Sequence, residues 1–121
     1  MSALSDALAK RGKLIGTMIT LPSNMVAEAL SVSGLDWLFF DLEHSVMTLA
    51  EVQAMIQAMD RGCLAMIRVE EPSAIWVKRA LDTGCAAVIV PQVNTPRSLQ
   101  TPFLAKVVVF TRRHRVLKEE W

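Results

Sequence analysis

A histidine and two carboxylates stand together directly after an apolar stretch of strand length. Residues 37–40 read Trp-Leu-Phe-Phe, and Asp41, Glu43 and His44 follow at once. An imidazole with a pKa near neutrality is a natural general base, and neighbouring carboxylates can orient it and favour its protonated form. Two structural alternatives remain open, because the carboxylates could cap the following segment and His44 could be a hydrogen-bonded loop residue.

An arginine occupies the corresponding place in the next apolar stretch. Arg68 lies within residues 64–69, and Glu70 and Glu71 follow. A guanidinium can hold a substrate carboxylate through two hydrogen bonds and can stabilise an enolate as charge develops on oxygen. The structural alternative is an ion pair between Arg68 and one of the two following glutamates.

A fourth apolar stretch ends in two amide side chains, Gln92 and Asn94. Either amide could contact a substrate, and hydrogen bonding within the loop explains both equally well. His114, the second histidine, stands in a charged segment, where we expect it to be solvated.

The stretches that carry these residues are separated by helix-like segments. Runs of strand length cover residues 14–21, 37–41, 64–69 and 86–90, and glycines 12, 34, 62 and 84 stand between the segments. Each glycine suits the left-handed position that closes a helix. Continuous apolar runs of this length are typical of parallel strands that are buried on both faces.

Two of the intervening segments have helical patterns with expected caps. Thr48 and Glu51 have the spacing of a capping box, and Ser73 can cap the second helix. The expected inner faces carry apolar residues three to four positions apart. These are Val52, Met55, Ile56 and Met59 in the first helix and Ile75, Trp76, Ala80 and Leu81 in the second.

This alternation predicts successive βα units, which must cross over right-handedly onto a parallel sheet. A flavodoxin-like sheet and a (β/α)8 barrel are both compatible with it. The barrel needs about 250 residues, so four units would form about half of one. In both folds reactive groups gather at the carboxyl ends of the strands, where Asp41, His44 and Arg68 are expected.

Composition and charge argue against several other classes of protein. Apolar residues make up 52% of the 121 residues, as expected for one globular domain. No apolar run approaches the roughly 20 residues that cross a bilayer, and no secretory signal is recognisable, so we expect a cytoplasmic protein without a membrane partner. Cys63 and Cys85 lack metal-ligand spacing and are expected to be buried free thiols.

Charge is unevenly distributed along the chain. Residues 1–96 hold seven basic and ten acidic side chains, a net charge of −3, whereas residues 97–121 carry +4. The basic cluster at residues 112–115 has no recognition fold or interleaved aromatic residues, so we expect no nucleic-acid partner. Residues 107–110 read as a short β run, and the charged residues 111–121 have no amphipathic stripe.

Four stretches of the chain resemble the HpcH/HpaI aldolases, a group that includes 2-dehydro-3-deoxyglucarate aldolases and stands near the citrate lyase beta chain. They are residues 34–44, 67–69, 81–86 and 89–95, in family order, and the resemblance extends over about residues 13–95. It implies a (β/α)8 barrel, usually assembled into hexamers of one chain. It also implies an enzyme that cleaves or forms the carbon–carbon bond next to a 2-oxo acid unit such as pyruvate. The enzyme would use a bound divalent cation (Mg, Mn or Co).

The resemblance also implies roles for individual residues. His44 would be the base, Arg68 would bind substrate and stabilise the transition state, and Asp41 would orient His44. Asp82 matches an aspartate credited with making that histidine more basic, and Gln92 would contact substrate. A helix that returns to the next strand ends at the opposite face of the same barrel, so Asp82 could act on His44 only from a neighbouring subunit.

The resemblance ends after Thr95. The family takes its metal ligands, a glutamate and an aspartate, from later strands, and the adjacent Glu119 and Glu120 are not substitutes for them. Metal ligands are therefore not expected in this chain. We interpret residues 1–95 as a partial aldolase-type barrel and residues 96–121 as a divergent tail.

The tail departs from the family at a recognisable place. Where the family continues into Tyr-Pro-Pro-x-Gly, residues 109–114 read Val-Phe-Thr-Arg-Arg-His. We hypothesise that the tail is an out-of-frame translation of an aldolase gene. Sequencing the encoding DNA tests this hypothesis, which fails if the shifted reading frame does not encode further barrel-like strands.

Two functional classes stay open. The first is a metal-dependent aldolase that releases pyruvate and an aldehyde from a 4-hydroxy-2-oxo acid and is inactive or impaired in this truncated form. The second is a non-catalytic half-barrel that acts only by association through unpaired strand edges and apolar faces.

Overall fold

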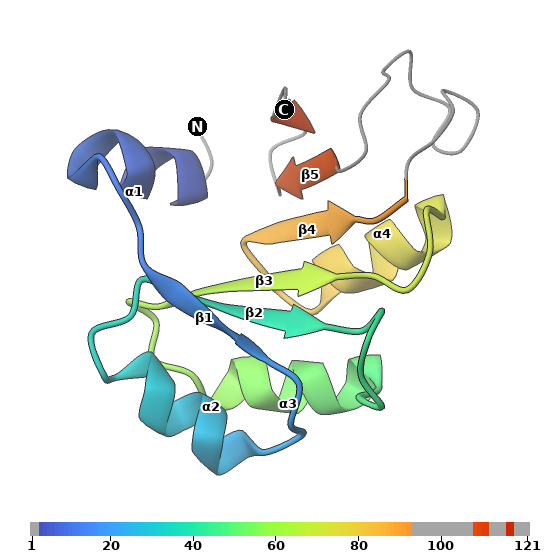
Figure 1. Cartoon of the computed structure of the whole chain (residues 1–121), viewed down its shortest axis with the longest axis horizontal. Helices are drawn as coiled ribbons and strands as arrows, with labels where there is room; N and C mark the ends of the chain where they lie inside the picture. Colours follow the sequence, from blue (N-terminus) through green and yellow to red (C-terminus); the bar gives the residue numbers. More distant parts are fainter. Residues whose placement is uncertain (1–2, 93–107, 112–115, 118–121) are drawn as a thin grey trace.

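A computed structural model of the chain describes residues 3–92, 108–111 and 116–117. Four parallel strands alternate with three helices: β1 (Gly16–Ile19), α2 (Asn24–Ser31), β2 (Trp37–Asp41), α3 (Leu49–Ala58), β3 (Leu64–Arg68), α4 (Ala74–Asp82) and β4 (Ala87–Val90). Helix α1 (Ala3–Arg11) precedes them and lies near the amino end of β1 (Figure 1). Within these described ranges no helix is long and apolar enough to cross a bilayer.

The order of the strands decides between the two expected architectures. The sheet runs β1-β2-β3-β4 in chain order, and each neighbouring pair of these strands is parallel. A flavodoxin-like sheet would place β1 between β2 and β3. Sequential order with helical crossovers is the arrangement of a (β/α)8 barrel, of which these units form the first half.

The parallel pattern ends at β4. Strand β5 (Val108–Thr111) pairs antiparallel with β4, and β6 (Val116–Leu117) pairs antiparallel with β5. The β run expected at residues 107–110 is thereby confirmed over residues 108–110, and residue 107 lies outside the described residues. A barrel would instead add a fifth parallel strand after a helix, so the backbone departs from the barrel pattern at β5.

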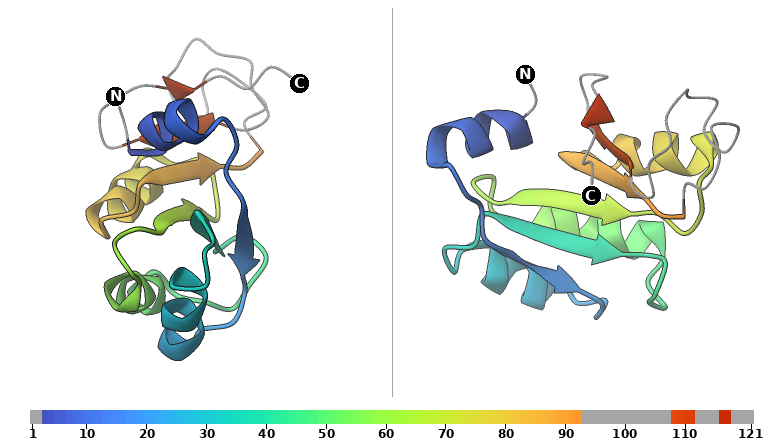
Figure 2. Two further views of the ribbon diagram at one scale, coloured as in Figure 1. Left: turned by 90° about the vertical axis from the view of Figure 1, so that its left-hand side faces the viewer. Right: turned by 45° about the horizontal axis from the view of Figure 1, so that its top comes forward.

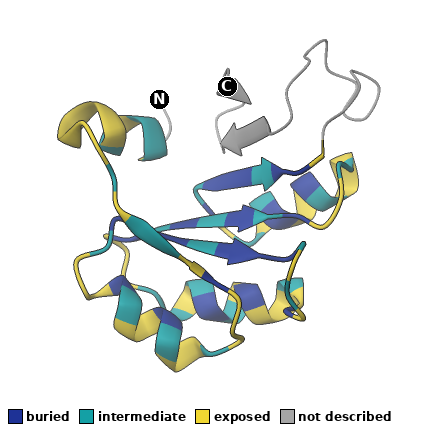
Figure 3. Ribbon diagram, in the orientation of Figure 1, coloured by how far each residue is buried: buried dark blue, intermediate teal, exposed yellow. Residues whose placement is uncertain are grey.

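The sheet has one covered face and one open face. Helices α2, α3 and α4 lie on the same side of the strands (Figures 1 and 2). Leu38, Phe40 and Ile67 are fully buried, and Figure 3 shows this burial concentrated in the middle strands. Alternate residues such as Phe39 and Met66 are only half-buried and point to the other face, which would be the interior of a complete barrel.

The expected capping box at the start of α3 is present. Glu51 donates its backbone N–H to the Thr48 hydroxyl (3.2 Å), and the Glu51 carboxylate accepts the Thr48 backbone N–H (2.7 Å). Val52 and Met55 are buried, and Ile56 and Met59 pack against the core, as their spacing predicts.

Helix α4 follows its expectation less closely. Ser73 is at the N-cap, but its side chain makes no capping hydrogen bond. Val77 and Ala80 form the buried stripe, whereas Ile75 is 70% exposed, so the prediction that Ile75 faces inward is wrong. Two helical positions correspond to a rotation of about 200°, which puts Ile75 on the side away from Val77.

The glycines that separate the units have two different structural roles. Gly12, Gly34 and Gly84 adopt positive φ angles of 75°, 95° and 93°, as the helix-closing positions predict. Gly62 does not, because α3 already ends at Ala58 and the Gly62 N–H donates to the Asp60 carboxylate (2.8 Å) in a turn.

Gly16 is required for a close approach between strands. A Cβ atom there would lie 2.1 Å from the Trp37 ring and 2.2 Å from the Trp37 carbonyl oxygen. Only a residue without a side chain lets β1 pack beside β2 at this point.

Strand β1 covers Gly16–Ile19 and is therefore shorter than the predicted strand over residues 14–21.

Both cysteines are buried and neither forms a disulfide, as predicted. Burial and the nearby Asp60 carboxylate raise the pKa of the Cys63 thiol.

Candidate active site

The register between β2 and β3 brings a carboxylate and a guanidinium side by side. Asp41 and Arg68 are direct cross-strand partners at the carboxyl ends of these strands. Arg68 Nε donates to Asp41 Oδ1 (2.9 Å) and Nη2 donates to Oδ2 (2.5 Å), forming a two-pronged ion pair. The side chain of Asp41 is 2% exposed and that of Arg68 is 25% exposed, so the pair is largely shielded from water.

Asp41 also shapes the loop that carries His44. Its Oδ1 atom accepts the backbone N–H groups of Glu43 (3.0 Å) and His44 (3.3 Å). The Ser45 hydroxyl donates to the Asp41 carbonyl oxygen. The capping role that the sequence left open for Asp41 is therefore present, and the same carboxylate also binds Arg68.

These contacts determine the ionisation of the pair. Burial alone would raise the pKa of Asp41, but hydrogen bonds from Arg68 and from the backbone of His44 and Glu43, together with the Arg68 charge, hold that pKa below its usual value. The hydrogen bond to Asp41 raises the pKa of Arg68 despite burial, and the charges of Asp41 and Glu43 act in the same direction. Asp41 is thus a fixed anion and Arg68 a fixed cation at neutral pH.

Glu43 connects the ion pair to the histidine. Its Oε2 atom lies 3.2 Å from Arg68 Nε and 3.6 Å from His44 Nε2. Its Oε1 atom accepts a hydrogen bond from the Gln92 side-chain amide (2.9 Å). The His44 side chain is 66% exposed, so the imidazole can reach a ligand from solvent.

Arg68 is held from a second direction by an aromatic ring. Its guanidinium carbon lies 5.5 Å from the centre of the Phe39 ring, within the range of a cation–π contact. Its ion-pair partners in the described part of the chain are Asp41 and Glu43 rather than Glu70 or Glu71. The structural alternative that paired Arg68 with those two glutamates is therefore wrong, because Asp41 is its direct cross-strand neighbour.

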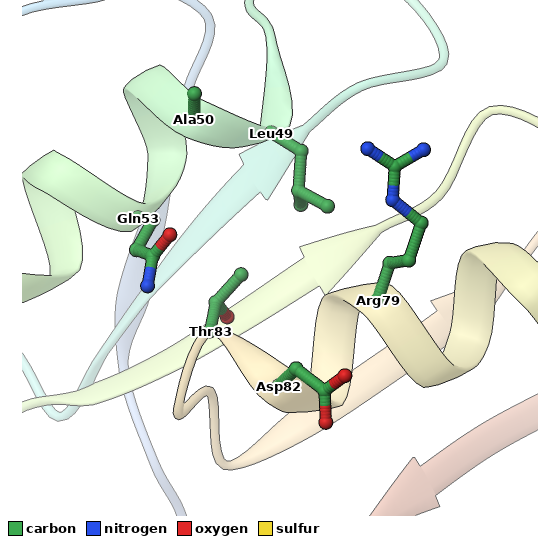
Figure 4. Close-up of a pocket in the computed structure, with 6 residues that line it drawn as sticks. All are labelled: Leu49, Ala50, Gln53, Arg79, Asp82 and Thr83. Carbon is green, nitrogen blue, oxygen red and sulfur yellow. The ribbon is translucent and has the colours of Figure 1, made fainter.

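Asp82 lies elsewhere in the molecule. It is the last residue of α4 and lines a hollow of about 300 Å³ between α3 and α4 (Figure 4). The other lining residues are Leu49, Ala50, Gln53, Arg79 and Thr83. This hollow belongs to the helix layer, so the chain by itself does not bring Asp82 to His44.

The carboxylates at the rim do not fit a divalent cation. Residues 3–92 contain no group of three or more histidine, cysteine, aspartate or glutamate side chains placed to hold one. Asp41 and Glu43 are both engaged by Arg68, whose positive charge opposes a second cation at the same oxygens.

Sequence reasoning does not single out every contributor to this cluster. It names Glu43 as a carboxylate that could orient His44 or cap the following segment, without the contact to Arg68, and it treats Phe39 only as part of an apolar strand. The positions of both residues carry a signal, since both stand within four residues of Asp41 and alternate residues of a strand share a face. Asn94, His114, Glu119 and Glu120 lie outside the described residues.

Comparisons with known proteins agree on one family. A sequence model of the HpcH/HpaI aldolase/citrate lyase family matches residues 15–115. The chain is 33% identical over 97 residues to a 4-hydroxy-2-oxovalerate aldolase of Rhodococcus jostii, covering 78% of this chain and 38% of that protein. It is likewise 33% identical over 102 residues to a hydroxypyruvate/pyruvate aldolase of Paraburkholderia phytofirmans, covering 78% and 39%.

Solved structures give the same result. An HpcH/HpaI aldolase/citrate lyase family protein of Burkholderia cenocepacia superimposes with a TM-score of 0.70 at 29% identity, over 81% of this chain and 40% of that one. Macrophomate synthase superimposes with a TM-score of 0.66 at 27% identity, over 80% and 34%. The chain thus spans about 40% of the length of the curated relatives it matches. The parallel units, the matched residues and these superpositions together show that the chain belongs to the HpcH/HpaI aldolase/citrate lyase family.

Proposed function

We propose that the chain carries the substrate-anchoring and proton-transfer part of a class II aldolase site. The reaction would cleave a 4-hydroxy-2-oxo acid to pyruvate and an aldehyde. The observation that supports this most strongly is the convergence of Arg68 and His44 on a single oxygen of Glu43, at 3.2 and 3.6 Å, at the carboxyl ends of β2 and β3. One aldolase relative that shares this segment is named for 4-hydroxy-2-oxovalerate, and another is named for hydroxypyruvate and pyruvate.

In the proposed mechanism, Arg68 binds the oxo acid through donors that Asp41 leaves free. Each guanidinium has five N–H groups, and two of them are used by Asp41. His44 accepts the proton of the substrate 4-hydroxyl, whose electrons form the aldehyde carbonyl while the bond between carbons 3 and 4 breaks. The resulting pyruvate enolate is stabilised by the Arg68 charge and takes up a proton at carbon 3.

Supporting residues complete the proposal. Asp41 holds Arg68 and the backbone of His44, and Gln92 stands at the same rim, where it can contact the substrate. The divalent cation (Mg, Mn or Co) expected for the family would need ligands other than the described carboxylates, so no step is assigned to it.

The proposed setting is a cytoplasmic homo-oligomer without nucleic-acid or membrane partners. A neighbouring subunit could supply Asp82, which the chain does not bring to its own His44.

The assay that tests the function measures pyruvate release from 4-hydroxy-2-oxopentanoate with Mn²⁺, with and without a chelator. We expect little or no release from this chain alone, because the described rim provides no metal ligands. Release that is abolished both by the chelator and by His44→Ala would overturn that expectation.

A chimera separates the enzyme from the alternative of a non-catalytic half-barrel. Residues 1–92 would be joined to the remaining part of the Rhodococcus jostii aldolase. We expect a folded barrel that releases pyruvate and loses this activity with His44→Ala or Arg68→Met. A chimera that folds but is inactive, or whose activity is insensitive to both substitutions, would favour association as the function of this segment.

A further inference from the structure

The loop after β4 reaches across the sheet to the loop after β2. Gln92 follows β4 by two residues, and its side-chain amide donates to Glu43 Oε1 at 2.9 Å. Strand β3 lies between β2 and β4 in the sheet, so this hydrogen bond joins two strand ends that are not neighbours. Arg68 is the last residue of the intervening strand, and its Nε atom lies 3.2 Å from Oε2 of the same Glu43 carboxylate.

The backbone of Gln92 is unusual at the same place. Its φ angle is +54°, the only positive value of a residue other than glycine among the described residues. Glutamine has no special tolerance for the left-handed region, whereas asparagine and glycine do. Such conformations persist where surrounding contacts impose them, and they cluster at functional sites.

The geometry of Glu43 explains what this contact achieves. Oε1 is held by Gln92, and the other oxygen, Oε2, then lies between Arg68 Nε (3.2 Å) and His44 Nε2 (3.6 Å). The Glu43 side chain is 10% exposed, although it stands in a loop. A carboxylate held at one oxygen can keep the other oxygen in a single orientation, which a freely rotating side chain could not do.

We propose that Gln92 is a positioning residue that acts through Glu43. Its amide holds the Glu43 carboxylate so that one oxygen serves Arg68 and His44 together. The residue after β4 thereby determines how the guanidinium and the imidazole are presented to a shared ligand. The catalytic value of this contact rests on the proposed function. The positioning of Glu43 by Gln92 does not depend on it.

The test observes the Arg68 Nε proton directly by nuclear magnetic resonance, with Arg68→Lys to assign its signal. Gln92→Asn keeps an amide and suits the left-handed backbone, but it is one methylene too short to reach Glu43. Asp41 keeps its hydrogen bond from the Arg68 Nε proton, so Gln92→Asn should loosen only the ion pair of Arg68 with Glu43. We expect solvent exchange of that proton to rise about threefold, the scale of losing one partly exposed ion pair. Thermal stability is expected to stay equal or to increase, because asparagine is less strained there.

Two further variants make the result specific. Gln92→Lys restores a long donor to Glu43 and is expected to retain the slow exchange. Gln57→Ala, at an exposed position of α3, is the control and should leave the Arg68 signal unchanged. Exchange that is unaltered in Gln92→Asn, or that rises only together with a loss of thermal stability, would overturn the proposal.

A pyruvate titration of the same samples separates this inference from the proposed function. If Gln92→Asn speeds exchange of the Arg68 Nε proton but no pyruvate binds at Arg68, the positioning role of Gln92 stands and the aldolase site is rejected. If pyruvate binds at Arg68 but Gln92→Asn leaves exchange of the Arg68 Nε proton unchanged, only the positioning role of Gln92 is rejected.

Discussion

Asp41 organises the candidate site at the scale of single residues. One buried carboxylate accepts two hydrogen bonds from Arg68 and two from the backbone of the loop that carries His44. The catalytic candidates are therefore not independent, since the position of each depends on the same anion. A change at Asp41 should disturb the guanidinium and the imidazole together.

Replacement of that anion has a pH-dependent cost. The folded pKa of Asp41 lies below its unfolded value, so its ionisation stabilises the fold above the unfolded pKa, and this stability is lost as pH falls through the folded pKa. We expect Asp41→Asn to lower the free energy of unfolding at pH 7 by about 2–4 kcal/mol, because Arg68 loses its buried partner. The difference from the wild type should shrink as the pH falls below about 4.

Denaturant titrations between pH 7 and pH 3 measure this effect. Asp6→Asn, at an exposed position of α1, serves as the matched control and should change stability little at any pH. A loss for Asp41→Asn that is equally large at both ends of the range would contradict the assigned ionisation.

At the scale of elements, most of the local signals in the sequence form as predicted. The capping box at Thr48 and the left-handed turns at Gly12, Gly34 and Gly84 are local features, and all of them form. Two other local predictions fail, since Gly62 has no positive φ angle and the Ser73 side chain makes no capping hydrogen bond. The remaining error is at Ile75, whose orientation depends on which face of α4 meets the sheet. That choice is made by packing between distant segments, which the spacing of apolar residues along one helix does not determine.

The two predicted caps allow a matched comparison. Thr48→Ala should destabilise the chain by about 1 kcal/mol, because it removes the hydroxyl that accepts the Glu51 N–H at the start of α3. Ser73→Ala should cost clearly less, since the Ser73 side chain makes no capping hydrogen bond to α4. Chemical unfolding of the two variants measures which one loses more stability. Equal losses would show that the capping hydrogen bond of Thr48 does not contribute to the stability of the chain.

The contact between β1 and β2 offers a second prediction at this scale. Gly16→Ala would place a methyl group against the Trp37 ring and carbonyl oxygen, so we expect a loss of about 3 kcal/mol. In a Trp37→Leu background only the clash with the ring is relieved, so the substitution should cost less but still destabilise. Thermal melts of the four chains measure this, and a fully additive result would argue that the contact between Gly16 and the Trp37 ring is not the cause.

For the whole molecule, the strand order explains how much of the site the sequence could reveal. Asp41 and Arg68 each end a recognisable strand, and consecutive parallel strands are neighbours in a barrel, so their meeting could be expected. The link from Gln92 to Glu43 could not, because it depends on the reach of two side chains across the intervening strand. The boundary near residue 95 and the origin of the following segment stay predictions.

The described strands leave one face of the sheet open. Residues that would line a barrel interior, such as Phe39, Met66 and Arg68, are half-buried on an open face. Arg68 nevertheless already has its two anionic partners within this chain. The anion-binding part of the site should therefore be measurable even where the complete reaction is not.

A pyruvate titration followed by nuclear magnetic resonance at the arginine side chains measures this property most directly. We predict saturable shifts of the Arg68 signals that are lost in Arg68→Met and retained in Arg79→Met, which removes the arginine stacked 5.7 Å from the Trp76 ring on α4. Pyruvate-dependent shifts that survive Arg68→Met, or that are absent from the wild-type chain at saturating pyruvate, would contradict the assignment of this rim as a 2-oxo acid site.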